Sequence, residues 1–142
     1  MNLVSVYRVK GAAKILYDLL AERPVENRIS HEVMPTPEEH NAFMFTKPFQ
    51  WWYLIEDGGE YVGAIEVTDF NEIGVTIFQK HVRKGYGTKA LDWFMEHHKP
   101  LPAIPARRCG YWTAHVAPQN EASKAFFRKA GFVLVQETYA KR

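Results

Sequence analysis

The sequence predicts an α/β fold in which helices cover both faces of a mixed, mostly antiparallel central sheet. Two observations carry this prediction. Segments with strand-like and helix-like patterns follow one another in the order βααβββαβαβ. This order combines consecutive strands, which favour antiparallel neighbours, with strand–helix–strand crossovers, which require parallel neighbours. We therefore expect one domain that spans residues 1–142.

Apolar periodicity and turn residues justify the elements in order. They predict a strand at 3–9, a helix at 12–20, a helix from residue 36, strands at 51–57, 60–69 and 72–78, a helix that opens within 81–94 and ends before residue 100, a proline-rich connection at 99–108, a strand at 109–116, a helix at 118–132 and a last strand at 132–139. Thr36, Pro37 and Glu39 form a capping box that starts the second helix. Gly58 and Gly59 predict a tight hairpin between two strands.

The composition is that of a globular protein with no strong charge bias. Its 142 residues are 46% hydrophobic, which is enough for a core, and the net charge of +2 is too small for a general nucleic-acid binder. No apolar stretch approaches the roughly 18 residues of a membrane span, and no signal peptide is recognisable. The lone Cys109 fits a reducing compartment. We therefore expect a cytoplasmic protein without nucleic-acid or membrane partners.

The stretch "HVRKGYGTKALDWF" (residues 81–94) places two glycines where a strand passes into a helix. Unpaired N–H groups at a helix start, together with the helix dipole, hold phosphate well. Gly85 and Gly87 would leave those groups accessible, and Arg83 and Lys84 add positive charge. Neither a dinucleotide fingerprint nor a P-loop is completed. A turn that serves only helix–strand packing therefore stays an alternative.

The segments "EIGVTIFQKHVRKGYGTKAL" (residues 72–91) and "VAPQNEASKAFFRKAGF" (residues 116–132) together resemble two motifs of the GNAT superfamily of acetyl-CoA-dependent N-acyltransferases. Their order, their spacing and the order of the elements are similar to that family over most of the chain. The resemblance implies a GNAT-like fold and acetyl-CoA as co-substrate, without a metal. It also implies direct transfer of acetyl to a primary amine in a ternary complex.

The resemblance further implies where the cofactor binds. The family's pyrophosphate loop falls on residues 82–87, with Val82 in place of the usual Arg or Gln. The strand before it would pair with the pantetheine amides, in a wedge between the fourth and fifth strands. Asn120 would meet the cofactor arm. The implied cofactor-binding residues are Val75, Thr76, Ile77, Arg83, Lys84, Gly85, Tyr86, Gly87, Thr88 and Asn120.

Amine acetylation needs a base, and Glu72 is the first candidate. It lies at the start of the fourth strand, where many family members carry a catalytic glutamate; a solvated carboxylate at a strand end is the simpler interpretation. Glu66 and Asp69 are the alternatives. A backbone N–H near Ile77 or Phe78 would stabilise the oxyanion.

Phe127 stands where the family usually has a tyrosine that protonates the leaving thiolate. A phenyl ring cannot donate a proton, so solvent, Ser123 or another tyrosine serves, or the thiolate leaves unprotonated. Because of Val82 and Phe127, a non-catalytic acetyl-CoA-binding or sensing domain remains the alternative function.

The acceptor is expected to be a small-molecule amine, and because the family often forms dimers a homodimer is kept open. The aromatic segment "PFQWWY" (residues 48–53) and the pair His31 and Glu32 either contact the acceptor or have structural roles. His97 and His98 are expected to meet carbonyls at a helix end rather than a metal.

Overall fold

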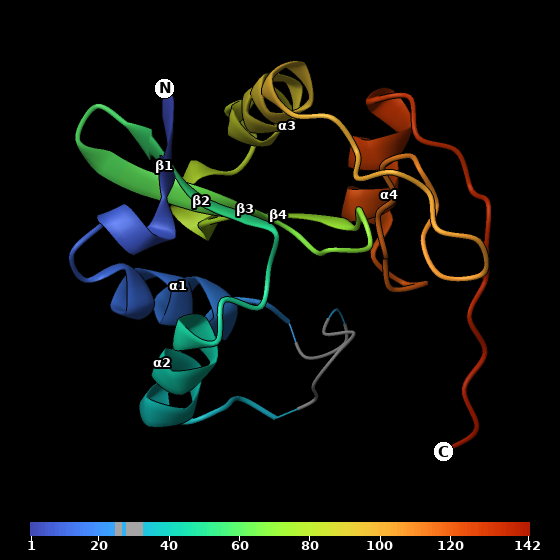
Figure 1. Cartoon of the computed structure of the whole chain (residues 1–142). Helices are drawn as coiled ribbons and strands as arrows, with labels where there is room; N and C mark the ends of the chain where they lie inside the picture. The colour runs from blue at the N-terminus through green and yellow to red at the C-terminus, as the bar shows by residue number, and fades with distance from the viewer. Residues whose placement is uncertain (25–26, 28–32) are drawn as a thin grey trace.

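The molecule is built on a four-stranded antiparallel sheet whose strands follow the order of the chain (Figure 1). A computed structural model describes residues 1–24, 27 and 33–142. The strands are β1 (Asn2–Ser5), β2 (Trp51–Asp57), β3 (Glu60–Val67) and β4 (Ile73–Ile77). The helices are α1 (Ala12–Ala21), α2 (Pro37–Phe45), α3 (Tyr86–His97) and α4 (Glu121–Lys129), with 3-10 turns η1 (Val6–Arg8) and η3 (Gln79–His81).

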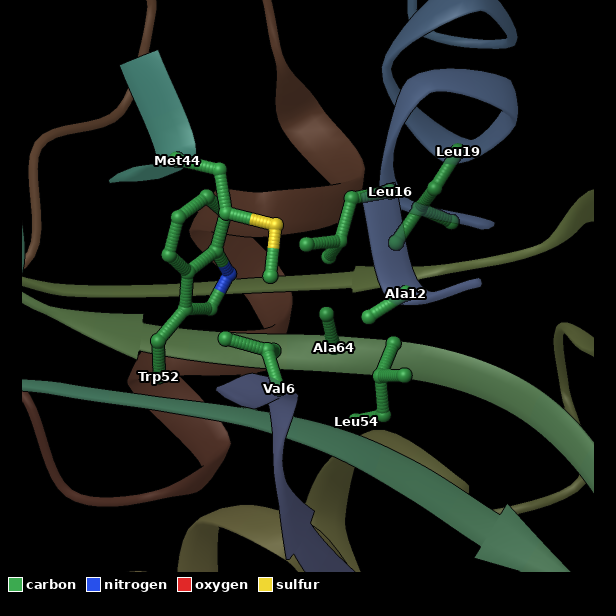
Figure 2. Packing of buried hydrophobic residues seen from close by; sticks show 8 residues of the cluster. All are labelled: Val6, Ala12, Leu16, Leu19, Met44, Trp52, Leu54 and Ala64. Carbon is green, nitrogen blue, oxygen red and sulfur yellow. The ribbon is translucent and has the colours of Figure 1, made fainter. Parts of the chain in front are cut away.

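Helices α1 and α2 lie on one face of the sheet, and α3 lies on the other (Figure 1). The alternation of side chains along β2 explains this arrangement. Leu54 belongs to the cluster beneath α1 and α2, whereas Ile55 clusters with Ala90 of α3. Figure 2 shows the first cluster, in which Leu16 of α1 lies over Leu54 and Ala64. The predicted α/β class, with helices on both faces, is confirmed.

Local sequence signals form as predicted at α2 and at the β2–β3 hairpin. The Thr36 hydroxyl accepts a hydrogen bond from the Glu39 N–H (3.1 Å), and the Glu39 carboxylate accepts one from the Thr36 N–H (3.0 Å). The hairpin turns at Gly58 and Gly59, whose φ angles are 60° and 84°. Both devices act within four residues, so they do not depend on distant contacts.

The first strand is shorter than predicted. The apolar run at 3–9 continues as a ladder only to Ser5, where β1 ends. The Ser5 hydroxyl then accepts a hydrogen bond from the Tyr7 N–H (3.4 Å), and the chain turns into η1. This turn carries Val6 into the core, where it is fully buried. Val6, in the second half of the apolar run, therefore contributes its side chain to the core from a turn rather than from a strand.

The predicted strand at 109–116 is reduced to one parallel bridge, between Thr113 and Glu72. Within the described residues its backbone pairs with β4 at this point alone. A ladder needs a partner along its length, and the segment diverges from β4 beyond Ile73. The sheet is therefore antiparallel, and the prediction of a mixed sheet is correct only for this single bridge.

The predicted last strand at 132–139 is wrong, because the segment forms no strand. Its apolar side chains lie in solvent: Val133, Leu134 and Val135 are 76%, 80% and 65% exposed. β-branched residues favour a strand only where another strand is available to pair with them. The order βααβββαβαβ therefore fails in both of its last strands, which depend on long-range partners.

Candidate functional site

Glu72 lies between β3 and β4, and its carboxylate is held by two side chains. The Thr68 hydroxyl donates a hydrogen bond to Glu72 Oε1 (3.1 Å), and Nε2 of His115 lies 3.0 Å from Oε2. The bridge to Thr113 fixes the Glu72 backbone. The Glu72 side chain is 26% exposed and that of His115 is 57% exposed. This arrangement can hold a proton on the carboxylate and exchange it with solvent through the imidazole.

Asn71 fixes the segments around Glu72, and sequence reasoning did not identify it. Its side chain is fully buried, and its amide donates hydrogen bonds to the carbonyls of Leu101 (3.0 Å) and Cys109 (2.8 Å). Its Oδ1 accepts one from the Leu101 N–H (2.8 Å). Its φ of 65° is a conformation that asparagine tolerates well. An asparagine at a turn is a weak signal, and only the fold shows that it joins three segments.

The outer edge of β4 presents backbone amide groups. The Ile73 N–H donates to the Thr113 carbonyl (2.8 Å), which lies on the side away from β3. Because backbone direction alternates along a strand, the N–H and C=O of Val75 and Ile77 also point outward, and those of Thr76 point toward β3. Beyond the bridge, no described segment pairs with this edge. Of the three residues whose backbone was predicted to contact the pantetheine amides, Val75 and Ile77 therefore face the open edge and Thr76 does not.

The turn before α3 opens the helix in the way that an anion site requires. Gly85 is the N-cap, with a φ of 83° that most side chains adopt only under strain. The N–H groups of residues 86–88 have no partner within the helix, as in any first helical turn. Arg83 and Lys84 are exposed beside them, and Val82 is 38% exposed. The turn thus combines free donors, the helix dipole and two cations.

The two glycines of this turn have different structural reasons. A Cβ added to Gly87 would lie 3.1 Å from the ring of Phe126 and 3.7 Å from Val75. Gly87 therefore lets α3 approach α4 and β4, as the packing alternative predicts. The Tyr86 hydroxyl donates to Asp57 (2.7 Å), which holds the pKa of that carboxyl below its usual range. The Tyr86 side chain is thus directed at the β2–β3 hairpin.

Asn120 and Phe127 both have structural partners. The Asn120 side chain caps α4 by accepting a hydrogen bond from the Ser123 N–H (3.2 Å). Phe127 is 9% exposed and packs edge-on against Phe126 and Phe132, at centroid distances of 5.0 and 5.2 Å. The position of the family's tyrosine is therefore part of the core.

Glu66 carries its carboxyl over the backbone of the neighbouring strand. A Cβ on Gly74, its partner in the β3–β4 ladder, would collide with the Glu66 carboxylate. The residue is only partly exposed, and burial raises the pKa of its carboxyl to about 7, against a lowering by Arg23. Asp69 is exposed after β3, and its carbonyl accepts a hydrogen bond from Arg108 (3.1 Å). Of these two alternatives to Glu72, Glu66 is therefore the one whose carboxyl lies against a neighbouring strand.

The aromatic segment divides between the two faces of the sheet. Trp52 is buried and packs against Phe49 on the α1 and α2 side, with ring centroids 4.8 Å apart. Trp51 joins the cluster of α3 on the other side. Both tryptophans therefore pack in the core. His31 and Glu32 lie outside the described residues.

Of the two histidines at the end of α3, His97 contacts a backbone carbonyl, as predicted, whereas His98 contacts the side chain of Tyr53. His97 stacks on Trp93 (4.0 Å between centroids), and its Nδ1 lies 2.8 Å from the Trp93 carbonyl. The Tyr53 hydroxyl lies 2.9 Å from Nε2 of His98, and burial lowers the pKa of that imidazole, with His97 adding to the effect.

In the part of the chain that the structure describes, no three acidic, histidine or cysteine side chains gather in a way that could hold a metal ion. No helix in this part is long and apolar enough to cross a membrane.

Comparison with known proteins agrees with this geometry. A family model described as an acetyltransferase (GNAT) domain matches residues 10–133. A search of curated proteins finds no match. An acetyltransferase from Thermus thermophilus has a similar structure, with a TM-score of 0.68 and 22% identity, covering 96% of this chain and 88% of that one. An aminoglycoside antibiotic 6′-N-acetyltransferase from Acinetobacter haemolyticus has a TM-score of 0.66 and 15% identity, covering 100% and 99%.

Proposed function

Because the chain belongs to the GNAT acetyltransferases, whose family model matches residues 10–133, we propose that it transfers acetyl from acetyl-CoA to a primary amine of a small molecule. Both substrates are bound together and the amine attacks the thioester directly. One observation carries the proposal: outward-facing amides of Val75 and Ile77 lie on the strand that leads to the cationic N-terminus of α3.

In this proposal acetyl-CoA supplies the thioester, and the chain holds it by its backbone. The pantetheine amides pair with Val75 and Ile77 at the edge of β4, as an added strand would. The pyrophosphate meets the N–H groups of residues 86–88, with Arg83 and Lys84 beside it. The Phe78 N–H already donates to Val62 (2.9 Å), so Ile77 is the proposed donor to the carbonyl oxygen.

Glu72 is the proposed general base. The support for this role is its position at the start of β4 and its contact with His115, which connects the carboxylate to solvent. The amine proton passes to the carboxylate and then through the exposed imidazole to water. The thiolate leaves unprotonated or is protonated by solvent, because Phe127 is buried in the core and the pKa of a free thiol is only about 8.5.

We also propose a small-molecule acceptor, a cytoplasmic location and a homodimer. The small-molecule acceptor is supported by the fold shared with the aminoglycoside acetyltransferase. The cytoplasmic location is supported by the single cysteine, Cys109. The homodimer is supported by the exposed apolar residues Val133, Leu134 and Val135. A non-catalytic acetyl-CoA-binding domain remains the alternative, because Phe127 and Val82 depart from the family pattern.

The first test is isothermal titration of acetyl-CoA into the wild type and into Gly85→Asp and Gly85→Asn. Asp and Asn have the same shape and both tolerate a positive φ, so the pair differs only in charge at the phosphate site. We expect the wild type and Gly85→Asn to bind, and Gly85→Asp to bind at least about tenfold more weakly, which corresponds to about 1.4 kcal/mol.

Absence of binding in the folded wild type would refute the proposed function. Equal affinities of the Asp and Asn variants for acetyl-CoA would show that the phosphate does not bind at this turn. Release of free thiol in the presence of primary amines then separates an enzyme from a binding domain.

A further inference from the structure

The proposed mechanism leaves the carboxyl of Glu66 unused, although this carboxyl lies within the sheet. A carboxyl in the middle of a sheet is unfavourable, because burial disfavours its charged form. A Cβ at Gly74 would meet the Glu66 carboxylate and displace it, so the carboxyl occupies space that Gly74 leaves open. A position maintained at this cost suggests that the carboxyl has a use.

Glu66 and Glu72 lie on the same face of the sheet. The Glu66 carboxyl covers Gly74, and Glu72 precedes Gly74 by two residues, so it projects to the same side. Thr68, two residues after Glu66, confirms this because its hydroxyl contacts Glu72. Diagonal neighbours on adjacent antiparallel strands have their side chains about 7 Å apart. Two carboxyls therefore flank one position on this face.

The environments of the two carboxyls differ. Glu72 is held by Thr68 and His115 and is open to solvent. Burial raises the pKa of Glu66 to about 7, and Arg23, which follows α1, lowers it. The helices over this face also carry ionisable groups, which are Lys14, Tyr17 and Asp18 on α1 and Glu38, Glu39 and His40 on α2. Tyr17 and His40 pack against each other, whereas Lys14, Glu38 and Glu39 are exposed. Within the described residues, Arg23 is the charged group that acts on Glu66.

The reaction releases two protons from the acceptor. A primary amine reaches the site as an ammonium ion and must lose one proton before its lone pair can attack. It loses the second after the C–N bond forms and the C–S bond breaks. A base whose pKa lies closer to that of the amine removes the first proton with a smaller free-energy difference. In many active sites, two carboxyls in different environments take different roles in proton transfer.

We propose that Glu66 is a second catalytic residue that accepts the first proton of the acceptor ammonium, while Glu72 accepts the proton released after C–N bond formation. The electron pair of the C–S bond leaves with the thiolate. One of the two protons neutralises that thiolate, through solvent, and the other reaches water through His115. This assignment rests on the proposed function and adds a residue to it.

The test is thiol release from acetyl-CoA with tyramine, hexylamine and an aminoglycoside as acceptors, measured from pH 6 to pH 10 in Glu66→Gln and Glu72→Gln. We expect Glu66→Gln to lower kcat/KM by about 10²-fold at pH 7. This loss shrinks to within about tenfold near pH 10, because solution then supplies neutral amine. Glu72→Gln loses activity at every pH, since the proton that Glu72 accepts leaves the nitrogen only after the amine has attacked the thioester.

Two variants control for effects on the structure. Gly74→Ala keeps the Glu66 charge but displaces the carboxyl, so it should reproduce the pH-dependent loss. Glu96→Gln removes an exposed carboxyl of α3 and should leave the rate unchanged. Activity of Glu66→Gln within twofold of the wild type at pH 7 would overturn the inference alone. Failure of the wild type to bind acetyl-CoA in the isothermal titration proposed above would instead refute the proposed function.

Discussion

Glu66 brings an ionisable group into the sheet, and this has a consequence for stability that is independent of activity. The pKa of the carboxyl is about 7 in the folded chain and about 4.3 in an unfolded one. Between these values the folded state binds more protons than the unfolded state. The contribution of Glu66 is therefore neutral below about pH 4 and becomes destabilising as the pH rises toward 7.

We predict that Glu66→Gln removes this pH dependence. At pH 8 the variant should be more stable than the wild type by up to about 3 kcal/mol, and near pH 5 the difference should be much smaller. Urea denaturation at the two pH values measures it. A stability difference that is the same at both pH values would mean that the Glu66 carboxyl is not desolvated in the folded chain.

Single residues also differ in how far the sequence predicts their roles. Glu72 was predicted from the sequence as the first candidate for the general base, and its contacts with Thr68 and His115 became visible only in the fold. Asn71 was not predicted at all, because its side-chain partners Leu101 and Cys109 lie 30 and 38 positions away in the sequence. The position of the Glu66 carboxyl depends on Gly74, which lies on another strand and has no side chain to displace it.

Among the elements, the β4–α3 connection is the one on which the cofactor proposal depends. Its strand, glycine turn and helix were all predicted from a continuous stretch of sequence. The positive φ of Gly85 is a local property of the turn, whereas the role of Gly87 depends on contact with Phe126 of α4. The free edge of β4 likewise depends on how the segment at 109–116 diverges.

The capping box of α2 gives an element-level prediction. Thr36→Ala removes the acceptor for the Glu39 N–H and should lower the free energy of unfolding by about 1 kcal/mol. Thr36→Ser keeps the hydroxyl and should lie close to the wild type. Thermal and urea unfolding of both variants measure the effect. Equal losses in Ala and Ser would show that the threonine methyl group, rather than the cap, stabilises α2.

For the whole molecule, the principal departure from the predicted sheet is the segment at 132–139, which pairs with no strand. Figure 1 shows the chain after α4 running along the outside of the molecule to its C-terminus. Val133 and Val135 are exposed there together with Leu134 and Tyr139. Consecutive exposed apolar residues of this kind often mark an interaction surface. They support the proposed homodimer.

We predict that the wild type has a mass above the 16.4 kDa of one chain in light scattering and that Val133→Lys/Val135→Lys reduces it to that value. The lysines remove apolar contact area and place like charges against each other in the pair. Gln136→Lys/Thr138→Lys adds the same charge at polar positions of the segment and should keep the larger mass. A wild type that is monomeric over a concentration series would refute the homodimer.

The sequence by itself determined the α/β class, the helices and the turns, together with the two motifs that resemble the GNAT family. These features arise from caps, glycine turns and apolar periodicity, whose interactions extend over a few residues. Only the tertiary structure decided that Glu66 and Glu72 share a face, that Asn71 joins three segments, and that the last two predicted strands have no continuous partner. Burial and strand pairing are properties of residues distant in sequence, so they appear only when the chain is folded.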